Sequence, residues 1–393
     1  MRNWLIVAHF LAPVLVTGCT VFSADPPAAR HDPVPKPLII AHRGASGYLP
    51  EHTLESYALA IEQGAHFIEA DLVITADGVL ISRHENDLSD TTDVAKKFPG
   101  RRRTKVVDGQ EVDGWFSEDF TLEEIKTLRA TERLPFRDQS SNGKFKVPSF
   151  DEVVQLVLSR SRDLGRPIGI YPETKHPSYF AALGLPLEEP LVAVLEEFGL
   201  NRANASVFIQ SFEVNNLRKL NEMTDVPLIQ LVSAPFLAPF DRQSSGGGLT
   251  YGDMITDAGL REIAIYADGI GPWKGLIVPR DEEGNLAPPT NLIDRAHAVG
   301  LAVHAYTFRS DGNYLAPQYD GDPGAEYRQF FGLDIDGVFT DFPDAAISAV
   351  GERATDGSRP IPPGCSRSPA RPLRVPSPSA SGVPAVPAAS PDP

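Results

Sequence analysis

Two histidines stand at the ends of short apolar runs in this sequence, where a folded chain would hold them rigidly. His42 follows the run at residues 38–41, and His84 follows the run at residues 79–82. An imidazole titrates near neutral pH, so two of them can supply a general base and a general acid to one reaction. One histidine at a strand end is often structural, but the two together predict a catalytic pair.

Three carboxylates occupy similar positions. Glu69 and Asp71 lie two residues apart in the apolar run 67–73, and Glu173 ends the run 167–173. Residues spaced by two lie on one face of a strand, so Glu69 and Asp71 point the same way. Converging carboxylates repel one another unless a cation lies between them, and oxygen ligands suit a hard divalent cation. The pattern predicts a metal site made by Glu69, Asp71 and Glu173.

Basic and aromatic side chains complete the set. Arg43 follows His42 directly, Lys175 follows Glu173 by two residues, and both are cations suited to phosphoryl oxygens. Later apolar runs end near further residues that we assign to substrate binding, namely Gln210, Trp273 and Tyr306. A metal site, two imidazoles and two basic side chains together predict a site for a phosphodiester. We interpret the other histidines of this region as structural or peripheral: His52, His66, His176, His297 and His304.

The residues that carry this chemistry fall on a regular alternation of apolar runs and helical patterns. We interpret the apolar runs as strands, at residues 38–42, 67–73, 167–173, 206–212, 227–232, 264–271, 301–306 and 337–342. Amphipathic segments lie between several of them. Eight strand–helix units predict an α/β fold of the (β/α)8 TIM-barrel class over residues 38–350. In such a barrel the carboxyl ends of all the strands meet at one mouth.

A polar insertion is predicted after the second strand region, at about residues 87–146. It contains Arg101, Arg102 and Arg103, which we interpret as a solvated loop and not as a nucleic-acid patch. A helix starts near Thr121, where the sequence has the spacing of a capping box. The one aromatic cluster of the insertion is Trp115, Phe116 and Phe120.

The charge and the cysteines of the chain limit its partners. Its 393 residues carry a formal net charge of −16, which argues against a basic groove for nucleic acid. The expected partner is a small-molecule substrate, and an anionic one would need local cations. The two cysteines, Cys19 and Cys365, both lie outside the predicted barrel, so we expect no disulfide in the core.

The two ends of the chain have compositions of their own. Residues 1–18 combine an apolar run with small residues before Cys19, which is typical of a bacterial lipoprotein signal. We predict cleavage before Cys19, lipidation of Cys19, and a tether over residues 19–37, so that the lipid anchor is the only membrane contact of an exported cell-envelope protein. If Cys19 is incidental, the protein is periplasmic or secreted. Residues 351–393, rich in Pro, Ser and Ala, predict a disordered tail.

Short motifs follow one another in a fixed order along the predicted barrel. They are AHRGASGYLPEHT (41–53), FIEADLVITADGVLISRHE (67–85), TTDV (91–94), FKVPSFDEV (145–153), YPETK (171–175), FIQSF (208–212), HAYTF (304–308) and DGVFTDFP (336–343). With these motifs the chain resembles the glycerophosphodiester phosphodiesterase family, specifically its secreted or periplasmic branch. Many members have Asn where this chain has His52, and Asp where it has Glu85. We interpret His52 as a structural variant near the pocket.

The resemblance implies a metal-dependent TIM barrel that hydrolyses glycerophosphodiesters to glycerol 3-phosphate and an alcohol, in the metabolism of phospholipid-derived glycerol. By matching motif, His42 and His84 would be the catalytic pair. The three carboxylates would bind a divalent cation, with Ca²⁺ placed ahead of Mg²⁺, and Arg43 and Lys175 would hold the phosphate. The nucleophile is either the 2-hydroxyl of the substrate's own glycerol or a water molecule.

Two other functions fit parts of the sequence. A phospholipase D-like lipid phosphodiesterase, of the sphingomyelinase D type, shares a barrel with two histidines and an acidic metal site. Such an enzyme should show an apolar surface around the barrel mouth, whereas the insertion here is mostly polar. A surface-anchored binding protein on an inactive barrel is the second alternative, and the presence of all the expected catalytic residues disfavours it.

Overall fold

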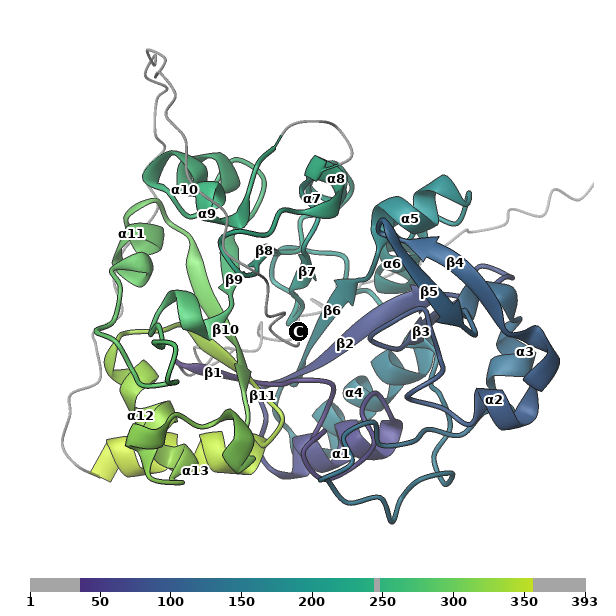
Figure 1. The fold of residues 1–393 in the computed structure, drawn as a ribbon, viewed down its shortest axis with the longest axis horizontal. Coiled ribbons are helices and arrows are strands. Elements are labelled where there is room, and N and C mark those ends of the chain that lie inside the picture. The colour runs from purple at the N-terminus through teal and green to yellow at the C-terminus, as the bar shows by residue number, and fades with distance from the viewer. Residues whose placement is uncertain (1–35, 244–247, 356–393) are drawn as a thin grey trace, which may run out of the picture. The chain divides into compact units, whose positions relative to one another are not determined.

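The computed structural model describes residues 36–243 and 248–355, which contain the barrel and its insertion (Figure 1). The predicted signal segment, Cys19, most of the predicted tether and the tail beyond residue 355 lie outside the described residues. The predictions for these segments therefore stay predictions. None of the described helices has the length and apolar character needed to cross a membrane.

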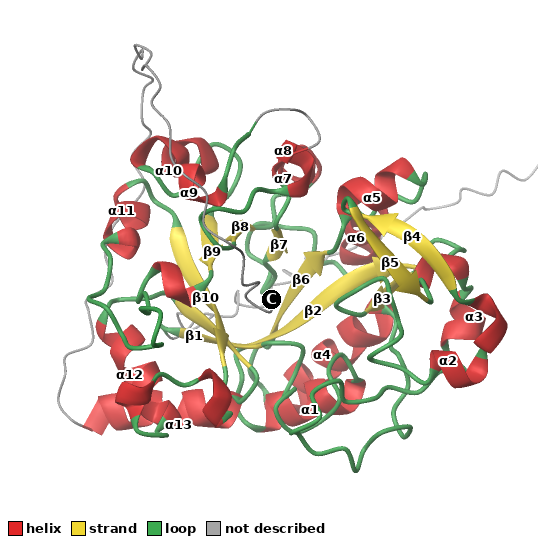
Figure 2. Ribbon diagram, viewed as in Figure 1, coloured by secondary structure: helices red, strands yellow, loops and turns green. Residues whose placement is uncertain are grey.

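Eight parallel strands close into a barrel, which confirms the predicted fold class (Figure 2). Their order around the ring is β1 (Leu38–Ala41), β11 (Gly337–Thr340), β10 (Ala302–Phe308), β9 (Gly269–Pro272), β8 (Leu228–Val232), β7 (Ile209–Ser211), β6 (Gly169–Thr174) and β2 (Phe67–Ile74). Pairing of β1 with β2 closes the ring. The extra strand β3 (Leu80–Ser82) pairs antiparallel with β2 and places the residues that follow it beside the barrel mouth.

Three strands begin two or more residues later than predicted: β6 by two residues, β7 by three and β9 by five. The run 264–271 was predicted to be extended, but β9 begins at Gly269. Helix α10 (Asp257–Ile263) continues into a turn in which the backbone N–H groups of Ala264 and Tyr266 donate to carbonyl oxygens of that helix. The start of this apolar run therefore forms a turn at the end of α10 and does not join the sheet.

Helices surround the barrel, and their apolar faces bury its outer surface. The longest of them, α4 (Phe150–Leu164), begins at a capping box made by Ser149 and Glu152 and ends at Gly165, whose φ is 62°. Gly165 takes this left-handed conformation without the steric strain that a side chain would add. The other helices are α1 (Leu54–Glu62), α5 (Pro177–Ala182), α6 (Glu188–Glu197), α7 (Val214–Met223), α8 (Phe240–Gln243), α9 (Tyr251–Met254), α11 (Leu292–Ala298), α12 (Pro323–Gly332) and α13 (Pro343–Thr355). Helix α13 thus continues past the predicted domain end at residue 350.

The inside of the barrel below its mouth is filled by large side chains. A buried cluster of strand residues closes it: Leu38, Ile40, Phe67, Tyr171, Ile229 and Phe339. The Tyr171 hydroxyl lies 2.8 Å from Nδ1 of His304, and both side chains are buried. His304, interpreted from the sequence as structural or peripheral, is therefore part of the core. Because the interior is packed, only the strand ends are left to form a site.

The insertion folds into small elements packed against the barrel mouth. They are α2 (Val94–Lys97), β4 (Arg103–Val107), β5 (Gln110–Gly114) and α3 (Leu122–Ile125), with 3₁₀ turns at Pro99–Arg101 and Ser117–Asp119. The predicted capping box is present, formed by Thr121 and Glu124. The β4–β5 hairpin was not predicted, although its Asp108-Gly109 turn, with φ of 47° and 79°, is a strong hairpin signal.

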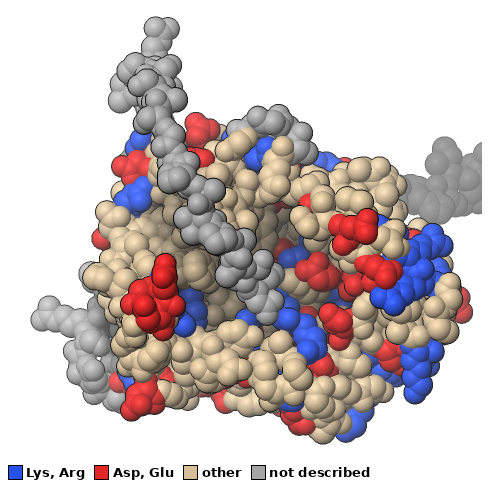
Figure 3. All heavy atoms as spheres, in the orientation of Figure 1, with Lys and Arg blue, Asp and Glu red and all other residues tan. Residues whose placement is uncertain are grey.

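The three consecutive arginines of the insertion are paired with carboxylates. Arg101 lies 2.6 Å from Glu124, Arg102 lies 3.0 Å from Asp113, and Arg103 lies 3.7 Å from Asp119. Figure 3 shows basic side chains gathered near β4 and α3, at the right of the view. Arg102 and Arg103 are exposed, as expected of a solvated segment, but Arg103 belongs to strand β4 and not to a loop.

Candidate active site

The barrel mouth contains a cavity that collects the predicted residues from the ends of five strands and from the loop after β3. It is lined by every predicted catalytic, metal-binding and substrate-binding residue except Trp273: His42, Arg43, Glu69, Asp71, His84, Glu173, Lys175, Gln210 and Tyr306. Three apolar side chains that sequence reasoning missed complete the wall, namely Phe212, Leu231 and Phe339. Phe212 ends the FIQSF motif, so the motif itself was the available signal.

Three carboxylates form the acidic centre of this cavity. Glu69 and Asp71 come from β2 and Glu173 from β6, where Asp71 and Glu173 are partners in the strand register. One oxygen from each of the three lies within 4.8 Å of the other two. Asp71 Oδ1 and Gln210 Oε1 are buried and have no hydrogen-bond partner among the described residues. Buried oxygens without donors fit a hard cation, which prefers oxygen ligands.

The charges of this centre support the same interpretation. Burial, together with the neighbouring carboxylates, raises the pKa of Glu69 well above its ordinary value. Burial also raises the pKa of Glu173 to about 8, although the Lys175 ammonium at 3.0 Å opposes the shift. Asp71 is buried too, but Lys175 and a hydrogen bond from His52 hold its pKa well below the ordinary value. The three groups therefore cannot all ionise easily without an added positive charge.

His42 is oriented by a carboxylate from the opposite end of the sequence. Its Nδ1 lies 2.6 Å from Oδ1 of Asp341, which follows β11. The other oxygen of Asp341 accepts from Arg137 Nη2 at 2.6 Å and from Arg309 Nε at 3.1 Å. Because this ionised carboxylate accepts hydrogen bonds, Nδ1 carries the imidazole proton and Nε2 is left as the basic nitrogen. Burial and the adjacent Arg43 lower the pKa of His42 to about 4, against the opposite effect of Asp341.

His84 has a similar arrangement made by other residues. Its Nε2 lies 3.3 Å from Lys175 Nζ, and its Nδ1 lies 2.8 Å from Glu85 Oε1. An ammonium can only donate, so Nε2 accepts and Nδ1 donates to Glu85. Burial, Arg43 and Lys175 lower the pKa of His84 to about 3. Both predicted catalytic histidines are therefore neutral near pH 7, each with a carboxylate on Nδ1.

Glu85 is held in turn by the insertion. Its Oε2 lies 2.9 Å from Nε2 of His176, whose Nδ1 lies 2.6 Å from Oδ2 of Asp108 in the β4–β5 turn. Burial alone would lower the pKa of His176, but the two carboxylates raise it to about 9. His176 was predicted to be structural or peripheral. In the structure it contacts Glu85, the same side chain that is bonded to His84.

Arg43 connects the cavity to the first loop. Its backbone N–H donates to Glu69 Oε2 at 2.7 Å, and its guanidinium lies 3.1 Å from Glu51. Gly44, with φ of 88°, turns the chain where any side chain would collide with Ser56. Glu51 therefore orders Arg43.

His52 lies behind the acidic centre and is fully buried. Its Nε2 lies 2.9 Å from Asp71 Oδ2, and its Nδ1 lies 2.8 Å from the Tyr57 hydroxyl. It does not line the cavity. This geometry fits the prediction that His52 is a structural variant. Through its contact with Asp71, His52 also orients a predicted metal ligand.

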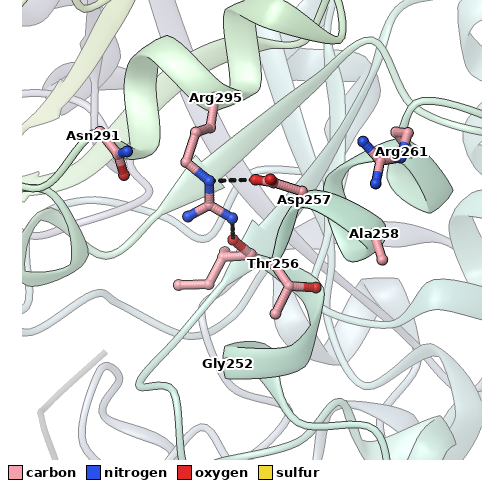
Figure 4. A pocket seen from close by; sticks show the side chains of 8 residues that line it. Gly252, Thr256, Asp257, Ala258, Arg261, Asn291 and Arg295 are labelled. Carbon is pink, nitrogen blue, oxygen red and sulfur yellow. Dashed lines mark hydrogen bonds and ion pairs between the residues drawn. The ribbon is translucent and has the colours of Figure 1, made fainter. Parts of the chain in front are cut away.

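Two other hollows lie outside this centre. Trp273 lines a neighbouring cavity that shares Tyr306 with the first one. A wider, shallow hollow lies over α9, α10 and α11, where Arg295 bonds to Asp257 Oδ1 and to the Ile255 carbonyl oxygen, both at 2.6 Å (Figure 4). None of the residues that line this shallow hollow is a histidine or a cysteine.

Comparison with known proteins gives one consistent result. Residues 42–345 match the glycerophosphoryl diester phosphodiesterase family. A glycerophosphodiester phosphodiesterase of Arabidopsis thaliana is 41% identical over 322 residues, covering 78% of this chain and 84% of the relative. A glycerophosphodiester phosphodiesterase of Haemophilus influenzae is 32% identical over 369 residues, covering 88% of this chain and 98% of the relative. An Oleispira antarctica phosphodiesterase, solved in complex with the product sn-glycerol-3-phosphate, has the same fold, with a TM-score of 0.53, 20% identity, and coverage of 80% of this chain and 97% of that one.

Proposed function

The chain belongs to the glycerophosphoryl diester phosphodiesterase family, and from this premise we propose that it hydrolyses soluble glycerophosphodiesters to glycerol 3-phosphate and an alcohol. One observation carries the proposal. Two neutral histidines, each with a carboxylate on Nδ1, line the cavity that holds the three buried carboxylates. The named activity of the relatives and the product bound to the Oleispira antarctica enzyme support the same substrate class.

We assign binding of the phosphoryl group to the cations of the cavity. Lys175 Nζ lies 3.0 Å from Glu173 and 3.3 Å from His84, so a phosphoryl oxygen bound there meets both the acidic centre and an imidazole. Arg43 adds a second fixed positive charge. A divalent cation bound by Glu69, Asp71 and Glu173 would neutralise these carboxylates and polarise a phosphoryl oxygen. We propose Ca²⁺ before Mg²⁺, because Ca²⁺ tolerates irregular sets of oxygen ligands.

The two histidines move the protons. One imidazole Nε2 accepts the proton of the attacking hydroxyl as the new P–O bond forms. The other imidazole, protonated when the anionic substrate binds, gives its proton to the oxygen of the leaving alcohol. The attacking hydroxyl is the substrate's glycerol 2-hydroxyl, which gives a cyclic phosphate that water then opens, or it is water itself. Trapping a cyclic phosphate by rapid quench would decide between the two.

The insertion favours water-soluble diesters over membrane lipids. Its aromatic cluster of Trp115, Phe116 and Phe120 is buried, so it does not form the apolar surface that a lipid phosphodiesterase needs at its mouth. Soluble diesters are what remains of phospholipids after deacylation, so we propose a role in recovering phospholipid-derived glycerol. Purified protein should release glycerol 3-phosphate from glycerophosphocholine and leave lysophosphatidylcholine and sphingomyelin intact. Cleavage of the two lipids alone would support the phospholipase D-like alternative, and no release of glycerol 3-phosphate from any common glycerophosphodiester would support the binding protein.

We also propose export by the N-terminal segment, with lipidation at Cys19. The sequence pattern around Cys19 supports this. In a bacterial host, full-length protein should fractionate with membranes and incorporate labelled palmitate, and Cys19→Ser should lose both properties. Unlabelled wild-type protein in the periplasm or the medium would instead favour an ordinary signal peptide.

A further inference from the structure

A second cavity adjoins the candidate active site. It has a volume of about 220 Å³ and lies beside the carboxyl ends of β9 and β10, next to α12. Tyr306 lines both cavities, and Trp273, which we predicted to bind substrate, lines only the second. A substrate whose scissile phosphate lies at the first cavity can therefore place its other end in the second by extending past Tyr306.

The wall of this second cavity is cationic, although the whole chain has a net charge of −16. Three basic residues line it, Lys274, Arg280 and Arg309, and Glu326 is the one carboxylate among the lining residues. Glu326 Oε1 accepts from Lys274 Nζ at 2.8 Å and from Arg280 Nη2 at 3.3 Å. One carboxylate is thus shared by two cations, and a positive charge remains.

Arg309 adds to this wall N–H groups that can donate hydrogen bonds to a ligand. The residue is only 5% exposed, and its Nε donates to Asp341 Oδ2 at 3.1 Å. Its two terminal NH₂ groups donate to no other residue in the described part of the chain, and its guanidinium lies 4.5 Å from the centre of the Tyr314 ring. A buried guanidinium is stabilised when an anion accepts from its free donors, and the planar fork of Arg fits phosphate oxygens.

We propose that the second cavity binds a second phosphate group of the substrate, so that the enzyme prefers glycerophosphodiesters whose alcohol is itself phosphorylated. An oligomer of glycerol phosphate has this chemistry. The aromatic residues of the cavity could in principle cage a quaternary ammonium. The Tyr314 ring, however, already lies against Arg309, and the three basic residues repel a cationic head group.

The test compares two diesters that differ by one phosphate, and it rests on the proposed function. Glycerophosphoglycerol and its phosphorylated form are hydrolysed at equal ionic strength, and the ratio of their kcat/KM values is measured. We expect the phosphorylated diester to be preferred about tenfold, the scale of one hydrogen bond to a charged group. Arg280→Met, at a partly exposed position on the cavity wall, should remove most of this preference and leave kcat/KM for glycerophosphoglycerol within about twofold.

Arg261→Met is the matched control, because it removes the same charge from an exposed position in the separate hollow of Figure 4. It should keep the full preference. Lys274→Gln is a second variant of the same wall, for use if Arg280→Met unfolds at a lower temperature. Equal kcat/KM for the two diesters in the wild type, or a preference that survives both wall variants, would overturn the inference and leave the proposed function standing. Hydrolysis of neither diester would instead contradict the proposed function.

Discussion

The two candidate catalytic histidines are supported by different parts of the molecule. His42 follows barrel strand β1, and its carboxylate partner Asp341 is 3% exposed and bonded to two buried arginines. His84 follows the extra strand β3, and its partner Glu85 is 46% exposed. Glu85 is held through His176 by Asp108, on the tip of the insertion hairpin. The same hydrogen bond to Nδ1 is thus made once inside the barrel wall and once near the solvent.

Because of this difference, substitutions on the two sides should affect catalytic activity and the free energy of unfolding to different extents. Removing a carboxylate from a buried charge network leaves its partners unpaired in a low dielectric, whereas an exposed pair is screened by water. Changes on the His42 side should therefore lower both activity and stability. Changes on the His84 side should lower activity with little effect on the free energy of unfolding.

The largest effect is expected from removing either imidazole. His42→Ala and His84→Ala should each lower kcat by about 10²- to 10⁴-fold, the usual scale for a general acid or base. Steady-state release of glycerol 3-phosphate measures it. If one variant kept full turnover, the two-histidine mechanism would be wrong and the comparison between the two sides would lose its basis.

Asp341→Asn should produce the next largest effect. The amide can no longer balance Arg137 and Arg309, and it does not fix the His42 tautomer as the carboxylate does. We expect kcat to fall about 10²-fold or more and the free energy of unfolding to fall by about 3–5 kcal/mol, measured by urea unfolding. Unchanged stability would show that the buried network does not hold this side of the barrel.

Glu85→Gln tests the exposed side in the same way. The orienting hydrogen bond to His84 becomes weaker, and we expect kcat to fall about tenfold, as for the loss of one hydrogen bond to a charged group. The free energy of unfolding should change by less than about 1 kcal/mol, because Glu85 is partly solvated. A stability loss as large as that of Asp341→Asn would remove the contrast between the two sides.

A pH dependence of stability that comes from His176 is expected on the same side. Its pKa in the folded protein is raised to about 9, above the ordinary 6.5. Its contribution to stability is therefore fully present below about pH 6.5 and is lost as the pH rises through 9. Wild type should be more stable than His176→Gln at pH 6, and the difference should vanish near pH 10. A difference that is constant across this range would exclude the His176 charge as its source.

The barrel side of the site could be predicted because its signals are local. The signals are the apolar runs, the Glu69-x-Asp71 spacing and the polar residue after each run, and each of them spans only a few positions. Parallel strands in a barrel bring the ends of these runs together, whichever helices connect them. For this reason Glu69, Asp71, Glu173 and His42 were found without knowledge of the fold's exact geometry. Their chemical roles stay predictions.

The insertion side could not be predicted in the same way. Arg137 of the insertion bonds to Asp341, and this contact joins residues 204 positions apart, which no local pattern indicates. Asp108 was missed because the hairpin that carries it was read as part of a polar loop. Trp273 was predicted at the site, and the structure places it in the second cavity, because side-chain direction at the end of β9 is not set by sequence spacing.

We propose that the three buried carboxylates hold a divalent cation on which hydrolysis depends. The most direct measurement is the rate of glycerol 3-phosphate release from glycerophosphocholine by EDTA-treated protein as Ca²⁺ or Mg²⁺ is added back. We predict that chelation abolishes the rate, that Ca²⁺ restores it in the wild type, and that Asp71→Asn needs far more Ca²⁺ or does not recover. Full activity of the chelated wild-type protein, with no response to either cation, would contradict the account.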